Sequence, residues 1–145
     1  MQTLKNSDEK VFYESHMDTK LNCIYSTWLG YVNLNSVKSG CLVGLDLIKE
    51  TNCPYIINDN TDLIGPWQQA NEWIQEFWMP KAIEAGLRYM AHVTSPDIFG
   101  KLSAKDLEKK AAGIFTMRLF STKEQASEWI RECQEKDSET EMGRE

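Results

Sequence analysis

The sequence NDNTD, which begins at Asn58, groups oxygen-bearing side chains of the kind that bind calcium. Asn58, Asn60 and Asp62 match positions 1, 3 and 5 of a calcium-binding loop. The match then fails, because position 6 is Leu63 in place of the glycine that makes the sharp turn. Position 12 is Gln69 in place of a bidentate glutamate. The stretch therefore predicts no metal site, and we expect the chain to carry no cofactor.

Two carboxylates in the same stretch have the spacing to act together. Asp59 and Asp62 follow an apolar run and precede a helical pattern, which is where open α/β sheets bind ligands. An enzyme at this position would need one of the two in a cleft, with a raised pKa. A capped turn is the alternative, because the positive end of a helix dipole also favours acidic residues. We take as a candidate binding loop Asp59, Asn60, Thr61, Asp62 and Gly65.

The other reactive side chains form no recognisable catalytic or phosphate-binding motif. The chain has 2 histidines, His16 and His92, and neither has a cysteine or carboxylate partner at zinc-ligand spacing. A Cys23–His92 pair is conceivable, but we favour the interpretation that the two are a core thiol and a core imidazole. The sequence contains neither a GxSxG elbow nor a phosphate-binding glycine motif. We therefore predict no catalytic residues and expect a protein that is not an enzyme.

Hydrophobic periodicity predicts the elements that must position these residues. Strands are expected at Lys10–Ser15, Leu21–Val32, Pro54–Asp59, Leu87–Ser95 and Gly113–Ser121. The first two form an antiparallel hairpin. Helices are expected over Asn35–Asn52, over Pro66–Gly86, from Ser103 onward and over Ser121–Lys136. Their predicted N-caps are Asn35 or Ser36, then Ser103, then Ser121, since short polar side chains accept hydrogen bonds from the first turn.

The order of these elements, ββαβαβαβα, predicts a single α/β domain over residues 1–134. Its mixed sheet has about five strands, with an N-terminal antiparallel hairpin and four helices, because strand–helix alternation produces parallel crossovers. The charged segment 135–145 has almost nothing to bury, so we expect a disordered tail there.

The helix after the candidate loop carries an apolar stripe that is wider than one sheet contact requires. Trp67, Ile74, Phe77 and Trp78 share one face, and Trp73 flanks it. Three interpretations remain open: a core face, an interface, or a pocket. The candidate pocket or interface residues are Trp67, Trp73, Phe77 and Trp78.

Charge and composition limit the partners. The 145 residues carry a formal net charge of -6, which disfavours a nucleic acid or an anionic membrane as partner. No segment is apolar enough to span a bilayer, and the polar N-terminus has no secretory h-region. The 4 cysteines have no CxxC spacing and lie in or beside apolar runs, which favours buried free thiols in a reducing cytoplasm over a disulfide.

Several short motifs resemble the STAS/SpoIIAA-like domains, small bacterial α/β modules whose fold is related to that of CRAL-TRIO lipid-transfer domains. The resemblance rests on WLGYV in the hairpin, INDN before a helix, the later SPDIFGKLS segment and the element order. It covers residues 8–134. It implies a regulatory domain that works by binding other proteins.

Members of that family carry an approximate Asp-Ser-Ser-Gly pattern whose serine is phosphorylated. The matching residues here are Asp62, Leu63, Ile64 and Gly65, so the acid and the glycine are present and both hydroxyls are absent. The nearest hydroxyl belongs to Thr61, where a phosphate would lie between two aspartates.

We therefore expect a non-enzymatic, cytoplasmic regulatory or protein-interaction module that binds a protein partner or self-associates and lacks the phospho-switch serines. The alternative is a protein that binds a small apolar molecule or lipid in a pocket near Trp67–Met79. Such a pocket would enclose roughly 300 Å³ or more.

Overall fold

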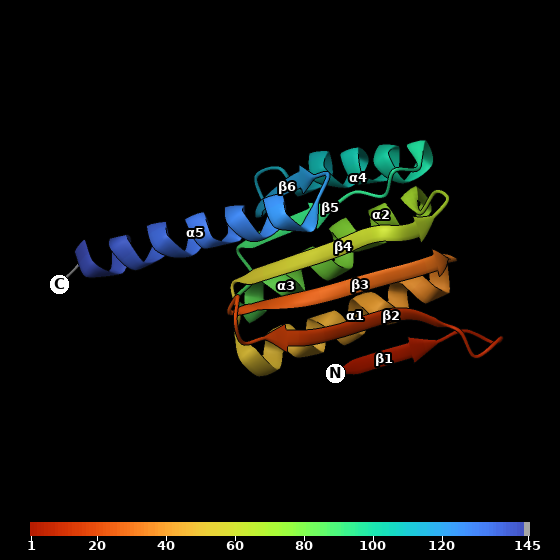
Figure 1. Cartoon of the computed structure of the whole chain (residues 1–145), viewed down its shortest axis with the longest axis horizontal. Coiled ribbons are helices and arrows are strands. Elements are labelled where there is room, and N and C mark those ends of the chain that lie inside the picture. The colour runs from red at the N-terminus through yellow and green to blue at the C-terminus, as the bar shows by residue number, and fades with distance from the viewer. Residues whose placement is uncertain (144–145) are drawn as a thin grey trace.

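A six-stranded mixed sheet forms the centre of the structure, a computed structural model that describes residues 1–143 (Figure 1). The strands lie side by side in sequence order. They are β1 (Gln2–Lys5), β2 (Val11–Asp18), β3 (Cys23–Tyr31), β4 (Tyr55–Ile64), β5 (Tyr89–Val93) and β6 (Thr116–Phe120). The pairs β1–β2 and β2–β3 are antiparallel, and the other pairs are parallel. The predicted α/β class and N-terminal hairpin are confirmed.

One strand was missed by the sequence prediction. β1 is a short edge strand of mostly exposed residues, so its sequence, QTLK, shows no burial pattern. It pairs with β2 from Gln2↔Ser15 onward.

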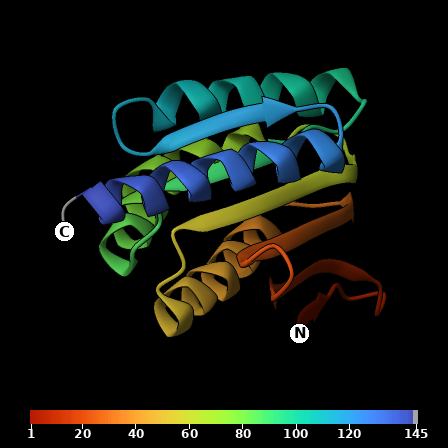
Figure 2. The ribbon, with the colours of Figure 1, turned by 60° about the vertical axis from the view of Figure 1, so that its left-hand side comes forward.

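The helices pack in two layers around the sheet. They are α1 (Leu34–Thr51), a compound helix, α4 (Ile98–Ala111) and α5 (Lys123–Gly143). The compound helix consists of η1 (Gln68–Ala70), α2 (Asn71–Trp73), the π-helical η2 (Ile74–Trp78) and α3 (Met79–Ala85). α1, the compound helix and α4 cover one face of the sheet, and α5 covers the other (Figures 1 and 2). Successive right-handed crossovers that step in one direction place their helices on the same face.

Pro80 lies inside the compound helix without ending it. A proline has no N–H and its ring clashes with the carbonyl group four residues earlier, which normally breaks a helix. Here η2 precedes it, and the Met79 N–H donates to Ile74 O, five residues back. The wider π-helical turn accommodates the proline, so the helix expected over Pro66–Gly86, with a kink or restart at Pro80, continues through this residue.

The helix starts differ from the predicted caps. Asn33 caps α1 by accepting from Ser36 N at 2.8 Å, where Asn35 or Ser36 was predicted. Asp97 caps α4, so the helix starts at Ile98 and not at Ser103. The predicted loop SPDIFGKL therefore contains the first turns of α4. Its early apolar residues face outward, which obscures the helical burial pattern.

α5 runs to Gly143, so residues 135–143 are helical where a disordered tail was expected, and residues 144–145 lie outside the described part. The reason is a tertiary anchor at Asp137, inside the expected tail. Its carboxylate accepts hydrogen bonds from the Tyr55 and Tyr89 hydroxyls. Those two rings stack at 5.6 Å between centroids. Glutamate and lysine also have good helix propensity, so the backbone continues at little cost.

The anchor can be tested by replacing Asp137 with alanine. We expect faster amide hydrogen exchange over residues 138–143 and a loss of about 1 kcal/mol of stability, since two part-exposed hydrogen bonds to a carboxylate disappear. Glu135→Ala, at an exposed position on the same helix, is the matched control and should leave exchange unchanged. Equal exchange in the two variants would show that the tyrosines do not hold the helix.

Candidate functional site

The candidate binding loop is part of β4 in the structure. β4 pairs with β3 as far as Tyr31↔Ile64, whereas its pairing with β5 ends at Asp59↔Val93. The predicted strand end at Asp59 thus corresponds to the end of pairing on one side only. Polar residues continue the strand because β3 supplies backbone partners beyond that point.

A β-bulge in this part of β4 separates the side chains. Thr27 pairs with Asp59 and Leu29 pairs with Asp62, so β4 has an extra residue here. Asp59 is half-buried, Asn60 is buried, and Thr61 and Asp62 are exposed. The structure therefore does not gather the five candidate residues around one ligand. Gly65 follows in a turn with φ 85°, and its N–H donates to Asp97 Oδ2 at 2.7 Å.

The sheet topology also removes the reason for expecting a crevice at this point. Open α/β sheets bind ligands where the strand order reverses and neighbouring crossovers diverge. Here the strands follow sequence order across the sheet, and no such reversal occurs among the described strands.

Asp59 does not have the electrostatics of a general acid. Burial favours its neutral form, but hydrogen bonds from Thr61 and Tyr25 outweigh burial, and the pKa of the carboxyl is lowered. Thr61 donates from its hydroxyl at 2.6 Å and its backbone N–H at 2.9 Å, and the Tyr25 hydroxyl also donates. Asp59 is therefore an ionised hydrogen-bond acceptor. The raised pKa that acid–base chemistry at this pair would need is absent at Asp59.

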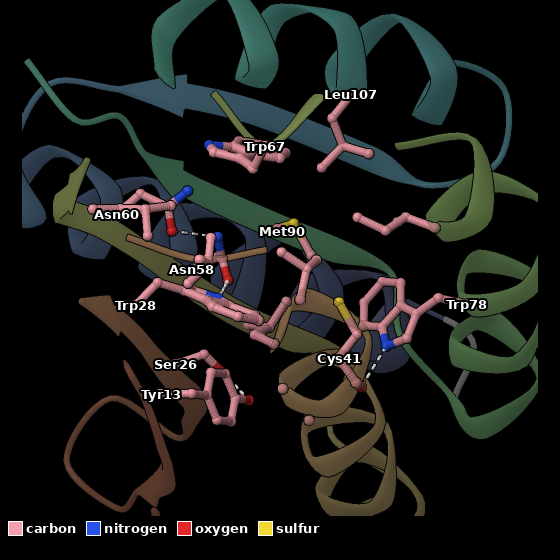
Figure 3. Close-up of a pocket in the computed structure, with 17 residues that line it drawn as sticks. Tyr13, Ser26, Trp28, Cys41, Asn58, Asn60, Trp67, Trp78, Met90 and Leu107 are labelled. Atoms are coloured by element: carbon pink, nitrogen blue, oxygen red, sulfur yellow. Dashed lines mark hydrogen bonds between the residues drawn. The ribbon is translucent and has the colours of Figure 1, made fainter. Parts of the chain in front are cut away.

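A polar network on the other face of β4 was not predicted. The Trp28 indole donates to Asn58 Oδ1 at 2.8 Å, which fixes the orientation of the Asn58 amide. Asn58 Nδ2 then contacts Asn60 Oδ1 at 3.2 Å and His92 Nδ1 at 3.1 Å (Figure 3 shows the first of these). Because an amide nitrogen only donates, His92 Nδ1 must accept, and the neutral ring carries its proton on Nε2. The only sign of this network in the sequence is that Asn58 and Asn60 are two residues apart, so their side chains lie on the same face of a strand.

His92 is the titratable member of this network. Its ring is 1% exposed and lies 5.7 Å from the Trp67 ring. Burial lowers the pKa of His92 to about 4, against a weaker opposing effect of Asp59. Cys23, the other member of the conceivable nucleophilic pair, faces α5 on the opposite side of the sheet, so the two do not meet.

The four candidate aromatic residues divide into two groups. Trp67 and Trp78 are buried and line a cavity of about 60 Å³ between the sheet and the helices (Figure 3). Trp73 is half-buried against the core and stacks on the exposed Phe77, with ring centroids 5.2 Å apart. Lys38 Nζ lies 5.6 Å from the Trp73 ring centroid and Lys81 Nζ lies 5.0 Å from the Phe77 ring centroid, so a cation partly covers each ring. The cavity is much smaller than the roughly 300 Å³ expected of a typical ligand pocket.

Five exposed apolar side chains, which we call the end patch, belong to the ends of β3 and β4 and to the first turns of α4. Its members are Tyr31, Ile64, Ile98, Phe99 and Leu102, each 46% to 77% exposed. Tyr31 and Ile64 are register partners, and the Gly65–Asp97 hydrogen bond joins their strand end to the start of α4. The ends of β3 and β4 and the start of α4 lie at the same end of the molecule (Figure 1). The sequence prediction missed the end patch because it placed Ile98, Phe99 and Leu102 in a loop.

Comparison with known proteins assigns no family: no protein-family model and no curated protein matches the sequence. Within residues 1–143, no three histidine, cysteine or acidic side chains are grouped in a way that could hold a metal ion. No helix of the described chain combines the length and apolar character needed to cross a membrane.

Proposed function

We propose that the protein is a protein-interaction module of the STAS/SpoIIAA-like class, which acts by binding a partner and not by catalysis. The observation that carries the proposal is the end patch. Large apolar side chains exposed at one end of the fold are the kind of surface feature that is typical of binding sites. The rigid ends of two paired strands and a helix position them, so little conformational entropy is lost when a partner binds.

The charge on the α4 part of the end patch favours an acidic protein partner. Lys101 and Lys105 are exposed on α4, within one turn of Leu102. They are positive in a chain whose net charge is -6. A partner with an apolar centre and acidic residues at its rim would complement both features. We therefore propose a partner surface of that chemistry.

The residues at the family's switch positions support a mode of binding without phosphorylation at those positions. Leu63, the first hydroxyl position in the resemblance, is buried in the core. Ile64, the second, belongs to the end patch. Neither can carry a phosphate, and Ile64 instead adds apolar surface. The proposed module thus uses the family's loop position as a permanent contact.

Phe99→Glu is the variant that tests the proposed function. A charge within the end patch should weaken partner binding roughly tenfold or more, because it places an unpaired carboxylate in a desolvated contact. The full chain is used to isolate partners from a lysate of the native cells. The dissociation constant of the purified partner is then measured for the original protein and each variant.

Phe77→Glu is the matched control, since Phe77 is also an exposed aromatic residue but lies outside the end patch. We expect a partner that Phe77→Glu retains and Phe99→Glu loses. Lys101→Glu with Lys105→Glu should slow association and reduce its salt dependence. Binding that Phe99→Glu leaves unchanged, self-association alone, or recruitment to anionic vesicles in place of a protein would each overturn the proposal.

A further inference from the structure

The two edge strands of the sheet, β1 and β6, differ in how well they resist further strand pairing (Figure 1). Proteins protect edge strands by keeping them short, by bulges and by lysines. β1 has all three features, because it has 4 residues, its register with β2 shifts between Leu4 and Lys5, and Lys5 is exposed. β6 pairs with β5 in unbroken register over all 5 of its residues and contains neither lysine nor proline. β6 is therefore the unprotected edge.

The outer side of β6 carries unpaired backbone groups. The Thr116 N–H donates to Arg88 O at 3.1 Å, and Phe120 O accepts a backbone hydrogen bond from the β5 side. Because backbone groups alternate in direction along a strand, the N–H and C=O groups of Met117 and Leu119 point away from β5. Within residues 1–143, β5 is the only strand that pairs with β6. These four groups thus have no strand partner.

Helices cover the two faces of β6 and leave its edge unpaired. Met117 and Leu119 pack in the core on the α4 side, and Phe120 packs in the core on the α5 side. Figure 2 shows β6 between these two helices. A strand that pairs with β6 would extend the sheet in its own plane.

Arg118 gives this edge a positive charge in a fixed position. Its guanidinium carbon lies 5.4 Å from the Phe120 ring centroid and 5.5 Å from the Trp129 ring centroid, and the side chain is exposed. Among the described residues, the one ion pair joins Lys110 and Asp106, so none of their acidic side chains pairs with Arg118. A guanidinium that is held against aromatic rings is ready to bind a carboxylate.

The same charge disfavours a second copy of this chain as the occupant. The antiparallel register that pairs the whole of β6 with a second β6 places the two Arg118 side chains directly opposite one another. Like charges at such positions destabilise a sheet, whereas opposite charges stabilise it. The residue that faces Arg118 should therefore be acidic.

We infer that the free edge of β6 is a docking site for an extended segment of a partner protein, which adds to the sheet as an antiparallel strand. The segment has an acidic residue opposite Arg118 and an apolar residue on each side of it. The backbone groups of Met117 and Leu119 bind its main chain, and the half-buried Leu119 side chain contacts its apolar residues. The site is separate from the end patch, and the inference does not depend on the proposed function.

The probe for this site is the synthetic peptide acetyl-Ser-Thr-Val-Glu-Val-Thr-Ser-amide. Its glutamate faces Arg118 when its two valines pair with Met117 and Leu119. The full-length protein, labelled with nitrogen-15, is titrated with the peptide through the millimolar range and followed in proton–nitrogen correlation spectra. We expect saturable downfield shifts of the Met117 and Leu119 amide protons, with a dissociation constant on the order of 1 mM. The Thr116 and Arg118 amide protons face β5 and should shift much less.

Two modified peptides test the backbone contacts. N-methylation of both valines removes the donors that face β6, so the saturable shifts should disappear. N-methylation of the glutamate removes a donor that faces away from β6 in an antiparallel pair, so binding should persist. The two peptides thus separate strand addition from a contact made by side chains alone.

Charge exchange tests the role of Arg118. A peptide with lysine in place of glutamate should bind roughly fivefold more weakly to the original protein. Arg118→Glu should reverse this preference, so that the lysine peptide binds the variant better than the glutamate peptide does. Phe99→Glu, which alters the end patch, should leave binding of the original peptide unchanged. If Arg118→Glu does not fold, the N-methylated peptides still decide the question on the original protein.

Three results would overturn the inference. The first is the lack of any saturable shift at Met117 and Leu119 through the millimolar range. The second is equal binding of the two N-methylated peptides, which would mean that no strand is added. The third is a dimer of the free protein in which the Met117 and Leu119 amides are protected from exchange, which would assign the edge to a second copy.

Discussion

Lowering the pH from about 6.5 to about 4 is expected to remove about 3 kcal/mol of folding stability through His92 alone. The folded-state pKa of His92 lies below its unfolded value because the ring is buried and its Nδ1 accepts a hydrogen bond from Asn58. Between the two pKa values the unfolded chain binds the proton and the folded chain does not. Stability therefore falls as the pH falls through this window and levels off below about 4.

Denaturant titrations at a series of pH values measure this effect. His92→Gln is the matched control, because its side-chain oxygen can accept from Asn58 and it cannot titrate. The variant should lose the pH dependence within the window. The carboxyl groups of Asp59 and Asp18 have lowered pKa values. The stability that they contribute is therefore lost only when the pH falls below the usual aspartate pKa of 3.8. A flat stability profile from pH 7 to pH 4.5 in the original protein would contradict the burial of a neutral imidazole.

Replacing Gly40 with alanine is expected to destabilise the protein by about 2 kcal/mol, although alanine has the better helix propensity. Gly40 lies in the middle of α1, where a Cβ would be 2.3 Å from Cη2 of the Trp28 ring. That ring cannot easily move, since it packs on Tyr13 with centroids 4.6 Å apart and donates to Asn58. Overpacking against a rigid ring outweighs the propensity gain of about 1 kcal/mol.

Gly44, one turn later on the same helix, provides the comparison. A Cβ there would meet only the Tyr13 hydroxyl, at 2.9 Å, which is the far end of a side chain. Gly44→Ala should therefore cost less than Gly40→Ala in denaturant unfolding at neutral pH. Equal costs would mean that Trp28 has room to shift. In Gly40→Ala, the indole proton signal of Trp28 should also move, because the ring is displaced from Asn58.

Both predictions concern residues that no sequence motif marked. Gly40 looked like an ordinary glycine in a helical pattern, and His92 like one of two isolated histidines. Their importance comes from contacts between α1, β3, β4 and β5, which are distant in the chain. The same contacts create the polar network and the cavity.

The end patch shows a second limit of sequence reasoning. Apolar periodicity predicts a helix when the apolar face is buried, and the first turn of α4 instead exposes Ile98 and Phe99. The helix start was therefore placed at Ser103, which lies inside α4 and donates to Phe99 O. Apolar residues that stay exposed violate the burial rule on which the prediction depends. Sequence reasoning fails here for a physical reason.

The sequence by itself determined the α/β class, the N-terminal hairpin and the approximate places of the helices, because local periodicity and turn residues carry that information. It also showed that Leu63 and Gln69 occupy the positions at which a calcium-binding loop requires a glycine and a glutamate. Only the tertiary structure decided that NDNTD is a bulged strand, that Trp67 and Trp78 line a small cavity while Phe77 is exposed, and that Asp137 anchors the last helix. Those outcomes depend on pairing and packing between distant segments. Composition and spacing leave such contacts undetermined.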